Sequence, residues 1–176
     1  KLREEFGQAT FFTATDGNHG RGVAWAANRL GQKAVVRMPK GTTKTRFDNI
    51  AKEGATVTIE EVNYDDCVRM AAAEAAKTEH GIIIQDTAWD GYEEIPSWIM
   101  QGYGTMANEL MISFTKLDVS VRHMYYSGWC WFTCRSSQGF FANRYPEIHR
   151  KLLLLKLRLL HVFTKEHVLR TELSAS

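Results

Sequence analysis

The sequence predicts an α/β fold in which a twisted parallel sheet is flanked by helices. Short apolar runs alternate along the chain with polar or alanine-rich segments of about ten to fifteen residues. Glycine or proline punctuates many of the boundaries between them. Strands that alternate with helices in this way form βαβ units, and such units build parallel sheets.

The composition is that of a soluble globular protein rather than of a disordered segment. Hydrophobic residues make up 44% of the chain and charged residues 24%, with a formal net charge of +2. Basic residues are interspersed with acidic ones, so the chain lacks the basic stripe of a nucleic-acid-binding protein. We expect no nucleic-acid partner.

The three cysteines, Cys67, Cys130 and Cys134, contain no C-x-x-C pair. Their number and spacing argue against a disulfide framework and predict no metal site. Residues 1–8 are charged and no apolar core follows, which is not the pattern of a signal peptide. The apolar stretch 152–160 is short and interrupted by basic residues, so it cannot span a bilayer. We expect a cytoplasmic protein that does not contact membranes.

The first half of the predicted sheet alternates strands and helices. We expect the end of a helix over residues 1–6, a strand over 10–15, a helix over 22–30 and a strand over 33–38. Gly31 stands where helices commonly end in a left-handed residue, and Pro39 with Gly41 ends the second strand.

The second half continues the alternation. We expect a helix capped by Thr42 or Thr43 and ending at Glu53, a strand over 56–59, a helix from Asp65 and Asp66 through Lys77, and a strand over 82–84. Pro96 then opens a longer helix over 97–114. Its two glycines, Gly102 and Gly104, predict tight contact with a neighbouring element.

A polar, glycine-rich loop follows the first predicted strand. Glycines let the backbone approach a ligand, and free N–H groups at the start of a helix attract anions. The loop also carries hydroxyl, carboxylate, amide and imidazole groups, on Thr15, Asp16, Asn18 and His19. We interpret it as an anion-binding loop. Taken alone, the pattern also fits a helix that Asp16 caps, with glycines in unusual backbone conformations.

A second polar loop, Gln85–Tyr92, follows the strand predicted over 82–84. Because the carboxyl ends of parallel strands meet at one edge of a sheet, we expect both loops to lie at that edge. Ligands of α/β sheets bind there.

The run Thr15-Asp16-Gly17-Asn18-His19-Gly20 resembles the (Ser/Thr)-x-Gly-Asn-His-Gly loop of pyridoxal-phosphate (PLP) enzymes with the tryptophan synthase β-like fold. Its Thr-Asp form resembles the diaminopropionate ammonia-lyases in particular. The similarity covers residues from about 9 to 126 and returns briefly over 139–149. It continues, in the same order, through Val36–Gly41, Asn63–Asp66, Gln85–Tyr92 and Ile95–Tyr103.

The resemblance implies a partial tryptophan synthase β-like fold and a role for each loop residue. Thr15 and His19 would bind the substrate carboxylate. Gly17, Asn18 and Gly20 would contact the cofactor, pyridoxal 5′-phosphate, with Asn18 reaching its ring oxygen. Without the resemblance, we would interpret His19 as a structural hydrogen-bond donor.

Two carboxylates would be catalytic by the same resemblance. Asp16 would take the α-proton of the substrate, which suits an enzyme that also handles the second stereoisomer. Asp86 would orient or bind the extra amino group of the substrate, because a carboxylate attracts an ammonium. Without the resemblance, Asp86 would be a helix cap at the end of a strand.

The activity implied is α,β-elimination of 2,3-diaminopropionate to pyruvate and ammonia, with an amino acid as substrate and a homodimer as the intact form. No lysine of the chain follows the family's lysine motif, so the chain as written is expected to be an inactive fragment. A threonine dehydratase-like PLP lyase and a non-catalytic truncated product are the alternatives. A nicotinamide-binding domain fits less well, because Gly17-x-x-Gly20-x-Gly22 is not G-x-G-x-x-G.

The sequence changes character over residues 127–138, where the family carries a glycine-rich phosphate loop. Read one nucleotide downstream, the junctions Trp129/Cys130 and Trp131/Phe132 must encode glycine, because Trp has one codon and Cys and Phe codons begin with T. We therefore interpret 127–138 and 151–176 as out-of-frame stretches that lack a packed role. Ordinary divergence is the alternative.

We expect three parts in the chain. Residues 1–113 would form a small cofactor- and substrate-loop domain with a returning helix. Residues 114–150 would begin a second, incomplete α/β domain, and 151–176 would be an out-of-frame tail.

Overall fold

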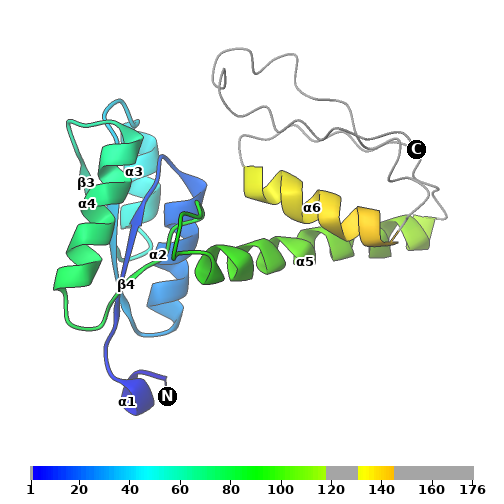
Figure 1. Ribbon diagram of the computed structural model, residues 1–176, viewed down its shortest axis with the longest axis horizontal. Coiled ribbons are helices and arrows are strands. Elements are labelled where there is room, and N and C mark those ends of the chain that lie inside the picture. The colour runs from blue at the N-terminus through cyan, green and yellow to red at the C-terminus, as the bar shows by residue number, and fades with distance from the viewer. Residues whose placement is uncertain (1, 118–130, 145–176) are drawn as a thin grey trace. The chain divides into compact units, whose positions relative to one another are not determined.

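A computed structural model describes residues 2–117 and 131–144 of the chain. The chain divides into two compact units between Ile99 and Met100. In chain order the elements are α1 (Leu2–Phe6), β1 (Thr10–Ala14), α2 (Asn18–Arg29), β2 (Lys33–Met38), α3 (Lys44–Ala51), β3 (Thr56–Ile59), α4 (Tyr64–Lys77), β4 (Gly81–Ile83), α5 (Glu94–Leu117) and α6 (Trp131–Arg144) (Figure 1).

The first unit contains a four-stranded parallel sheet in the order β3-β2-β1-β4. The chain moves outward from β1 to β2 and β3, and α4 then carries it back to β4 on the other side of β1. The strand order therefore reverses between β1 and β4. The α/β class predicted from the alternation of apolar and polar segments is confirmed.

Alternate residues of the strands face two separate cores. On one face, Ala34, Val36 and Met38 of β2 pack with alanines of α2 and with Ile50 of α3. On the other face, Phe12 and Ala14 of β1 pack with α4. Small side chains on both helices let them approach the sheet closely, and the two hydrophobic layers hold β1 and β2 between them.

Helix α2 begins at Asn18, four residues earlier than the predicted start at Gly22. Gly20 therefore lies inside the first turn, where a Cβ would overlap the Thr15 side chain and crowd Val36. A glycine is needed at position 20 because the helix approaches the sheet closely there, not because a loop requires an unusual backbone conformation. At the other end, Gly31 has φ 68° and the N–H groups of Gly31 and Gln32 reach back to Asn28 and Ala27, so the predicted helix end is confirmed.

Other helix and strand boundaries differ from the predicted ones by a few residues. Helix α3 follows Thr43 as predicted but ends at Ala51, and the Thr43 side chain makes no capping hydrogen bond. Strand β4 ends at Ile83, one residue early, while α5 extends beyond the predicted 97–114 at both ends. Helix α4 begins one residue early at Tyr64, with Asn63 accepting from the Asp66 N–H.

The prediction of tight contacts at Gly102 and Gly104 is wrong for the described residues. A Cβ at either glycine would meet no described atom within 4 Å. Both glycines are accommodated inside the 24-residue helix α5 without a packing reason among these residues.

The second unit contains α6, which contradicts the prediction that residues 131–138 lack a packed role. Residues 131–138, expected to lack a packed role, begin this helix, and Ser137 with Phe141 is buried one turn apart. The Ser136 hydroxyl donates to the Met100 carbonyl of α5. Aromatic residues occupy adjacent positions instead of helical spacing, so the sequence showed no helical period. Residues 127–130 and 145–176, with most of the predicted tail, lie outside the described residues.

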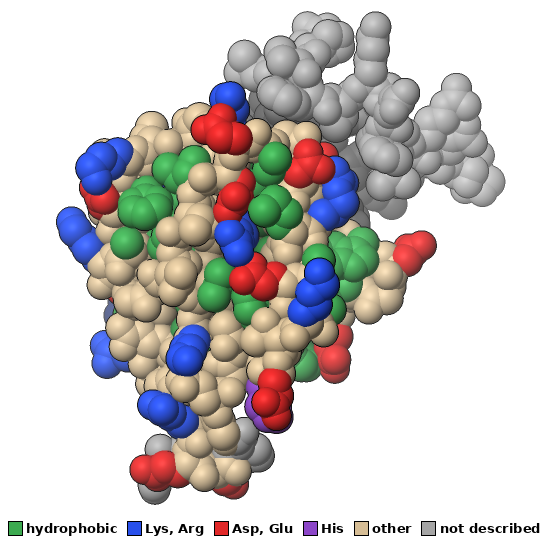
Figure 2. All heavy atoms as spheres, turned by 90° about the vertical axis from the view of Figure 1, so that its left-hand side faces the viewer, with side chains coloured by type: hydrophobic (Ala, Val, Ile, Leu, Met, Phe, Trp, Pro, Cys, Tyr) green, Lys and Arg blue, Asp and Glu red, His purple; other side chains and the backbone are tan. Residues whose placement is uncertain are grey.

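None of the described helices is long and apolar enough to cross a membrane. Within the described ranges, no group of three His, Cys, Asp or Glu residues is placed to hold a metal ion. Blue and red side chains are interspersed on the face seen in Figure 2, as the sequence predicted.

A partly buried charge network ties β2 to its neighbours. Arg37 contacts Glu60 beyond β3 and Glu74 of α4, each at 2.6 Å, and also donates to the Thr58 hydroxyl. Hydrogen bonds from Thr58 and Arg37 lower the pKa of Glu60. Because the pKa is lower in the fold than in the unfolded chain, this stabilisation is complete above the ordinary glutamate pKa and is lost as the pH falls.

We predict that Glu60→Gln lowers the free energy of unfolding by about 1–2 kcal/mol at pH 7. The difference from the unsubstituted chain should shrink at about pH 3, below the ordinary glutamate pKa, because the unfolded chain is protonated there and the lowered pKa of the folded state is being approached. Urea unfolding at the two pH values measures it. Glu61→Gln is the matched control, because its salt bridge to Lys40 is exposed. An equal effect at both pH values would contradict the charge pairing.

Candidate functional site

The candidate site lies at the carboxyl edge of the sheet, between β1 and β4. Parallel pairing places Phe12 of β1 opposite Ile83 of β4, so the loops that follow both strands leave the sheet side by side. The strand order reverses at this point, and open α/β sheets bind their ligands at such a reversal. The predicted meeting of the Thr15–Gly20 and Gln85–Tyr92 loops is confirmed.

A fully buried glutamine joins the two loops. The Gln85 Oε1 accepts from the Thr13 hydroxyl at 3.1 Å and from the Ala14 N–H at 3.0 Å. Its Nε2 donates to the Ala14 carbonyl at 3.1 Å and lies 2.7 Å from the Tyr64 hydroxyl oxygen. One side chain thus extends the hydrogen bonding of the sheet beyond the end of β4 and fixes the spacing of the two loops.

A tyrosine fixes the other side of the second loop. The Tyr92 hydroxyl accepts from the Gln85 N–H at 2.7 Å and lies 3.1 Å from the carbonyl oxygens of Ile83 and Gln85. The Tyr92 ring stacks on Trp89 at a centroid distance of 4.2 Å. These contacts fold Gln85–Tyr92 into a compact turn against the strand end.

The first loop is organised by Thr15, not by Asp16. The buried Thr15 hydroxyl accepts from the N–H groups of Gly17 and Gly20, at 3.0 and 3.2 Å. Gly17 is the N-cap of α2, and Asp16 makes no capping bond. The backbone N–H groups of Asn18 and His19 have no acceptor among the described residues. Two free donors at the start of a twelve-residue helix suit a carboxylate or another anion.

His19 and Asp86 meet across the gap between the two loops. The His19 Nε2 lies 2.9 Å from the Ile84 carbonyl oxygen, and its Nδ1 lies 4.0 Å from the Asp86 Oδ2. Both side chains are largely buried. His19 therefore makes the structural hydrogen bond that was considered as an alternative to a binding role. Asp86 stands before no helix start, so it is not a helix cap.

Asp16 lies at the exposed rim of the loop. Arg46 of α3 donates through Nη1 to the Asp16 backbone oxygen at 3.1 Å and lies 3.4 Å from its carboxylate. The Arg46 side chain also covers Gly17, near the position a Cβ would take. Arg46 therefore orients this turn from a third element.

The phenol of Tyr64 faces the same carboxylates. Burial, with the negative charge of Asp86 as the next cause, raises the pKa of Tyr64 to about 12. The hydroxyl consequently keeps its proton throughout the physiological range and remains a hydrogen-bonding group.

The structure brings together Thr15, Gly17, His19, Gly20 and Asp86. Asp16 and Asn18 belong to the same loop but are exposed, and the Asn18 amide makes no hydrogen bond to a described residue. The sequence pattern indicated no role for Gln85, Tyr64 or Arg46. Gln85 and Tyr64 belong to the motifs Gln85–Tyr92 and Asn63–Asp66 of the family resemblance. A polar residue directly after an apolar strand could have marked Gln85 as a site residue. No pattern in the sequence marks Arg46.

Comparison with known proteins identifies the family. Residues 1–127 match the family described as "Pyridoxal-phosphate dependent enzyme". The chain belongs to this family. The match ends at residue 127, where the predicted out-of-frame stretch 127–138 begins. That the stretch is out of frame stays a prediction.

Among its PLP-dependent relatives is the diaminopropionate ammonia-lyase of Salmonella typhimurium, 58% identical over 109 residues, or 62% of this chain and 27% of that protein. A crystal structure of the Escherichia coli diaminopropionate ammonia-lyase with an aminoacrylate-PLP azomethine reaction intermediate has a TM-score of 0.75 and 44% identity, covering 78% of this chain and 36% of that one. The threonine dehydratase IlvA of S. typhimurium is more distant, at 31% identity over 121 residues, covering 66% of this chain and 21% of that protein.

The chain therefore spans between a quarter and a third of the curated diaminopropionate ammonia-lyase that it matches. The predicted partial fold of a PLP-dependent enzyme is confirmed. The predicted similarity to diaminopropionate ammonia-lyases is confirmed as well.

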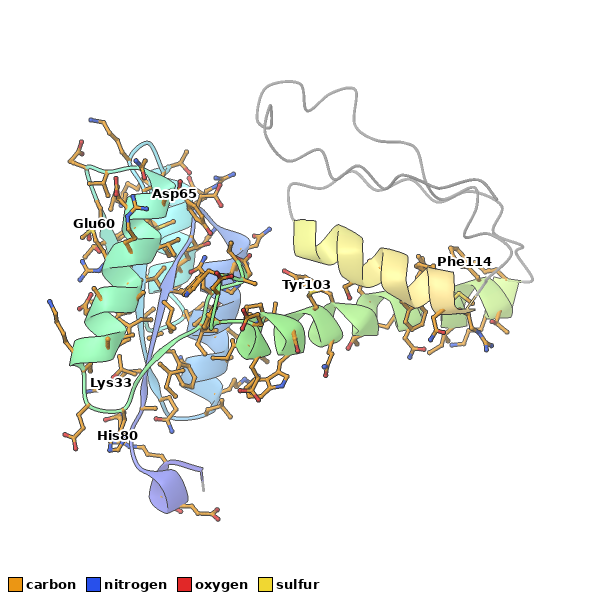
Figure 3. The ribbon with its side chains drawn as sticks, viewed as in Figure 1. Lys33, Glu60, Asp65, His80, Tyr103 and Phe114 are labelled. Atoms are coloured by element: carbon orange, nitrogen blue, oxygen red, sulfur yellow. The ribbon has the colours of Figure 1, made fainter. Side chains whose placement is uncertain are left out.

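The described residues fit one side of a PLP site. The free N–H groups of α2 and the unpaired Asn18 amide can receive a carboxylate and a ring oxygen. Among the described residues, no lysine makes a hydrogen bond or an ion pair with this loop; Lys40 and Lys44 pair with Glu61 and Asp48. Lys33 and His80 both lie at the amino-terminal end of the sheet, whereas Asp65 lies at the other end (Figure 3). A lysine and a phosphate loop would have to come from outside the described residues.

We predict that Gln85→Leu destabilises the chain by on the order of 3 kcal/mol, because it removes the buried hydrogen bonds that Gln85 makes with Thr13, with both Ala14 backbone groups and with Tyr64. Urea unfolding measures this loss. Gln101→Leu, on the exposed surface of α5, is the matched control and should change stability little. Equal, small effects of the two substitutions would show that the Gln85 hydrogen bonds do not hold the loops.

Proposed function

We propose that the chain is the substrate-binding part of a PLP-dependent ammonia-lyase that eliminates ammonia from 2,3-diaminopropionate and releases pyruvate and a second ammonia. The observation that carries this proposal is the meeting of an anion-binding helix start with the carboxylate of Asp86 at one strand edge. A diamino acid presents a carboxylate and a second ammonium, so it needs both kinds of group.

Each part of the site has a task in this proposal. Thr15 holds the loop so that the N–H groups of Asn18 and His19 bind the substrate carboxylate. Asn18, with the close backbone of Gly17 and Gly20, contacts the cofactor. PLP, when bound, withdraws electrons from the α-carbon and so makes its proton acidic.

The two acidic residues then divide the proton transfers. Asp16, kept in place by Arg46, takes the α-proton on the face of the substrate that it reaches. Asp86 attracts the second amino group and keeps it protonated, which makes ammonia a better leaving group. Burial of His19 and Asp86 excludes water from this part of the site.

The relatives support this proposal over the threonine dehydratase alternative. Identity is 58% to the ammonia-lyase of S. typhimurium and 31% to the threonine dehydratase. By resemblance to the family, we further propose that the intact enzyme is a cytoplasmic homodimer. Catalysis would also need the lysine and phosphate loop that the described residues do not supply.

A segment exchange tests the proposal. Residues Ala9–Leu117 would replace the corresponding segment of the S. typhimurium enzyme, which supplies the remaining parts of the site. We expect the chimera to release pyruvate from 2,3-diaminopropionate and to form little 2-oxobutanoate from threonine. A preference for threonine would favour the dehydratase alternative, and a folded chimera inactive on both substrates would favour the non-catalytic one.

In the active chimera, we predict that Asp16→Asn lowers turnover of D-2,3-diaminopropionate by roughly 10²–10⁴-fold, as expected for a lost general base. The L-isomer should be affected much less, because its α-proton leaves from the other face. Pyruvate release from each isomer measures the effect. Asp48→Asn, on α3 and paired with Lys44, is the control. Equal losses for both isomers would show that Asp16 only supports the loop.

A further inference from the structure

The hydrogen bond between His19 and Ile84 decides which ring nitrogen carries the proton. A backbone carbonyl can only accept, so the Nε2 that lies 2.9 Å from the Ile84 oxygen must donate. In a neutral imidazole the other nitrogen is then unprotonated. In that neutral form, His19 presents the lone pair of Nδ1 to the gap between the loops.

Asp86 presents a second acceptor to the same gap. Its Oδ1 lies 3.3 Å from the Gln85 Nε2, while Oδ2 faces the His19 Nδ1 at 4.0 Å. That separation is too long for a direct hydrogen bond. A nitrogen donor placed to one side of the line that joins the two atoms can lie at an ordinary distance from each, about 2.8–2.9 Å.

The two acceptors are fixed and largely removed from water. The Ile84 carbonyl orients the ring, the Gln85 amide holds the carboxylate, and the two side chains are only 14% and 18% exposed. Neither atom is a fully buried group without a partner, so both remain open to an entering ligand, and a cation with several N–H groups can bind the two together.

We propose that His19 Nδ1 and Asp86 Oδ2 form a two-acceptor clamp for the second ammonium group of the substrate. This inference rests on the proposed function and assigns its amine specificity. An ammonium has three donors and a positive charge, so it can satisfy both atoms, whereas a hydroxyl has one donor and no charge. The side chain of His19 thus binds the amine, and only its backbone N–H faces the substrate carboxylate.

The proton position is tested first on the full 176-residue chain labelled with ¹⁵N. Long-range ¹H–¹⁵N spectra at pH 8, where an imidazole is ordinarily neutral, distinguish the two tautomers. The His19→Gln variant assigns the His19 signals. We expect a protonated Nε2 and a bare Nδ1. A proton on Nδ1 would mean that His19 already donates to Asp86, and it would overturn the clamp.

Ligand selectivity is tested next, by NMR titration of the same chain with L-2,3-diaminopropionate, L-serine and L-alanine. We expect diaminopropionate to bind roughly tenfold or more tightly than the other two, as one hydrogen-bonded charge allows. Asp86→Asn and His19→Phe should remove that preference. His19→Gln keeps an amide N–H that can donate to Ile84 and an oxygen that can accept from the ligand. This variant should therefore retain part of the preference for diaminopropionate.

The outcomes separate the clamp from the proposed function. Equal binding of the three amino acids would overturn the clamp and leave the carboxylate-binding loop in place. Binding of none of them would overturn both the clamp and that loop in this chain. Loss of the preference in Asp86→Asn but not in His19→Phe would overturn the part assigned to His19. Thermal unfolding of each variant confirms that it is folded.

Discussion

The buried side chain of Gln85 is the interaction on which the site depends. Strand β4 has only three residues and pairs with β1 over that length, so its ladder alone would leave the following loop free to move. Gln85 continues the pairing through its side chain, with two hydrogen bonds to Ala14 and one from Thr13. Because all its amide atoms are used, the glutamine is inexpensive to bury and rigid once buried.

The reversal of strand order gives that connection its functional value. Loops after β1 and β4 would be separated by other strands in a sheet of sequential order. Here α4 returns the chain across the sheet, and β1 receives β4 as its second neighbour. The start of α2 and Asp86 consequently face the same gap, although His19 and Asp86 are 67 residues apart in the sequence. The backbone supplies the positive end of the site and the side chains supply the negative end.

Much of the fold followed from local patterns. Apolar runs marked all four strands to within one residue at each end, and Gly31 stands at the helix end where the capping rules predict a left-handed residue. The start of α2 was missed because Gly20 and Gly22 are poor helix formers, and the contacts that favour Gly20 in the helix come from Thr15 and from Val36 of β2. Helix α6 was missed because its apolar residues follow no period.

The sequence by itself determined the alternation of strands and helices, the glycine-rich loop and the residue types available for chemistry. These are local properties, set by periodicity, glycine and capping groups. Only the tertiary structure decided the contacts between distant segments: Gln85 with Ala14, Arg46 with Asp16, and the 4.0 Å gap between His19 and Asp86. Such contacts depend on the order of strands in the sheet and on side-chain direction, and neither leaves a periodic signal in a single chain.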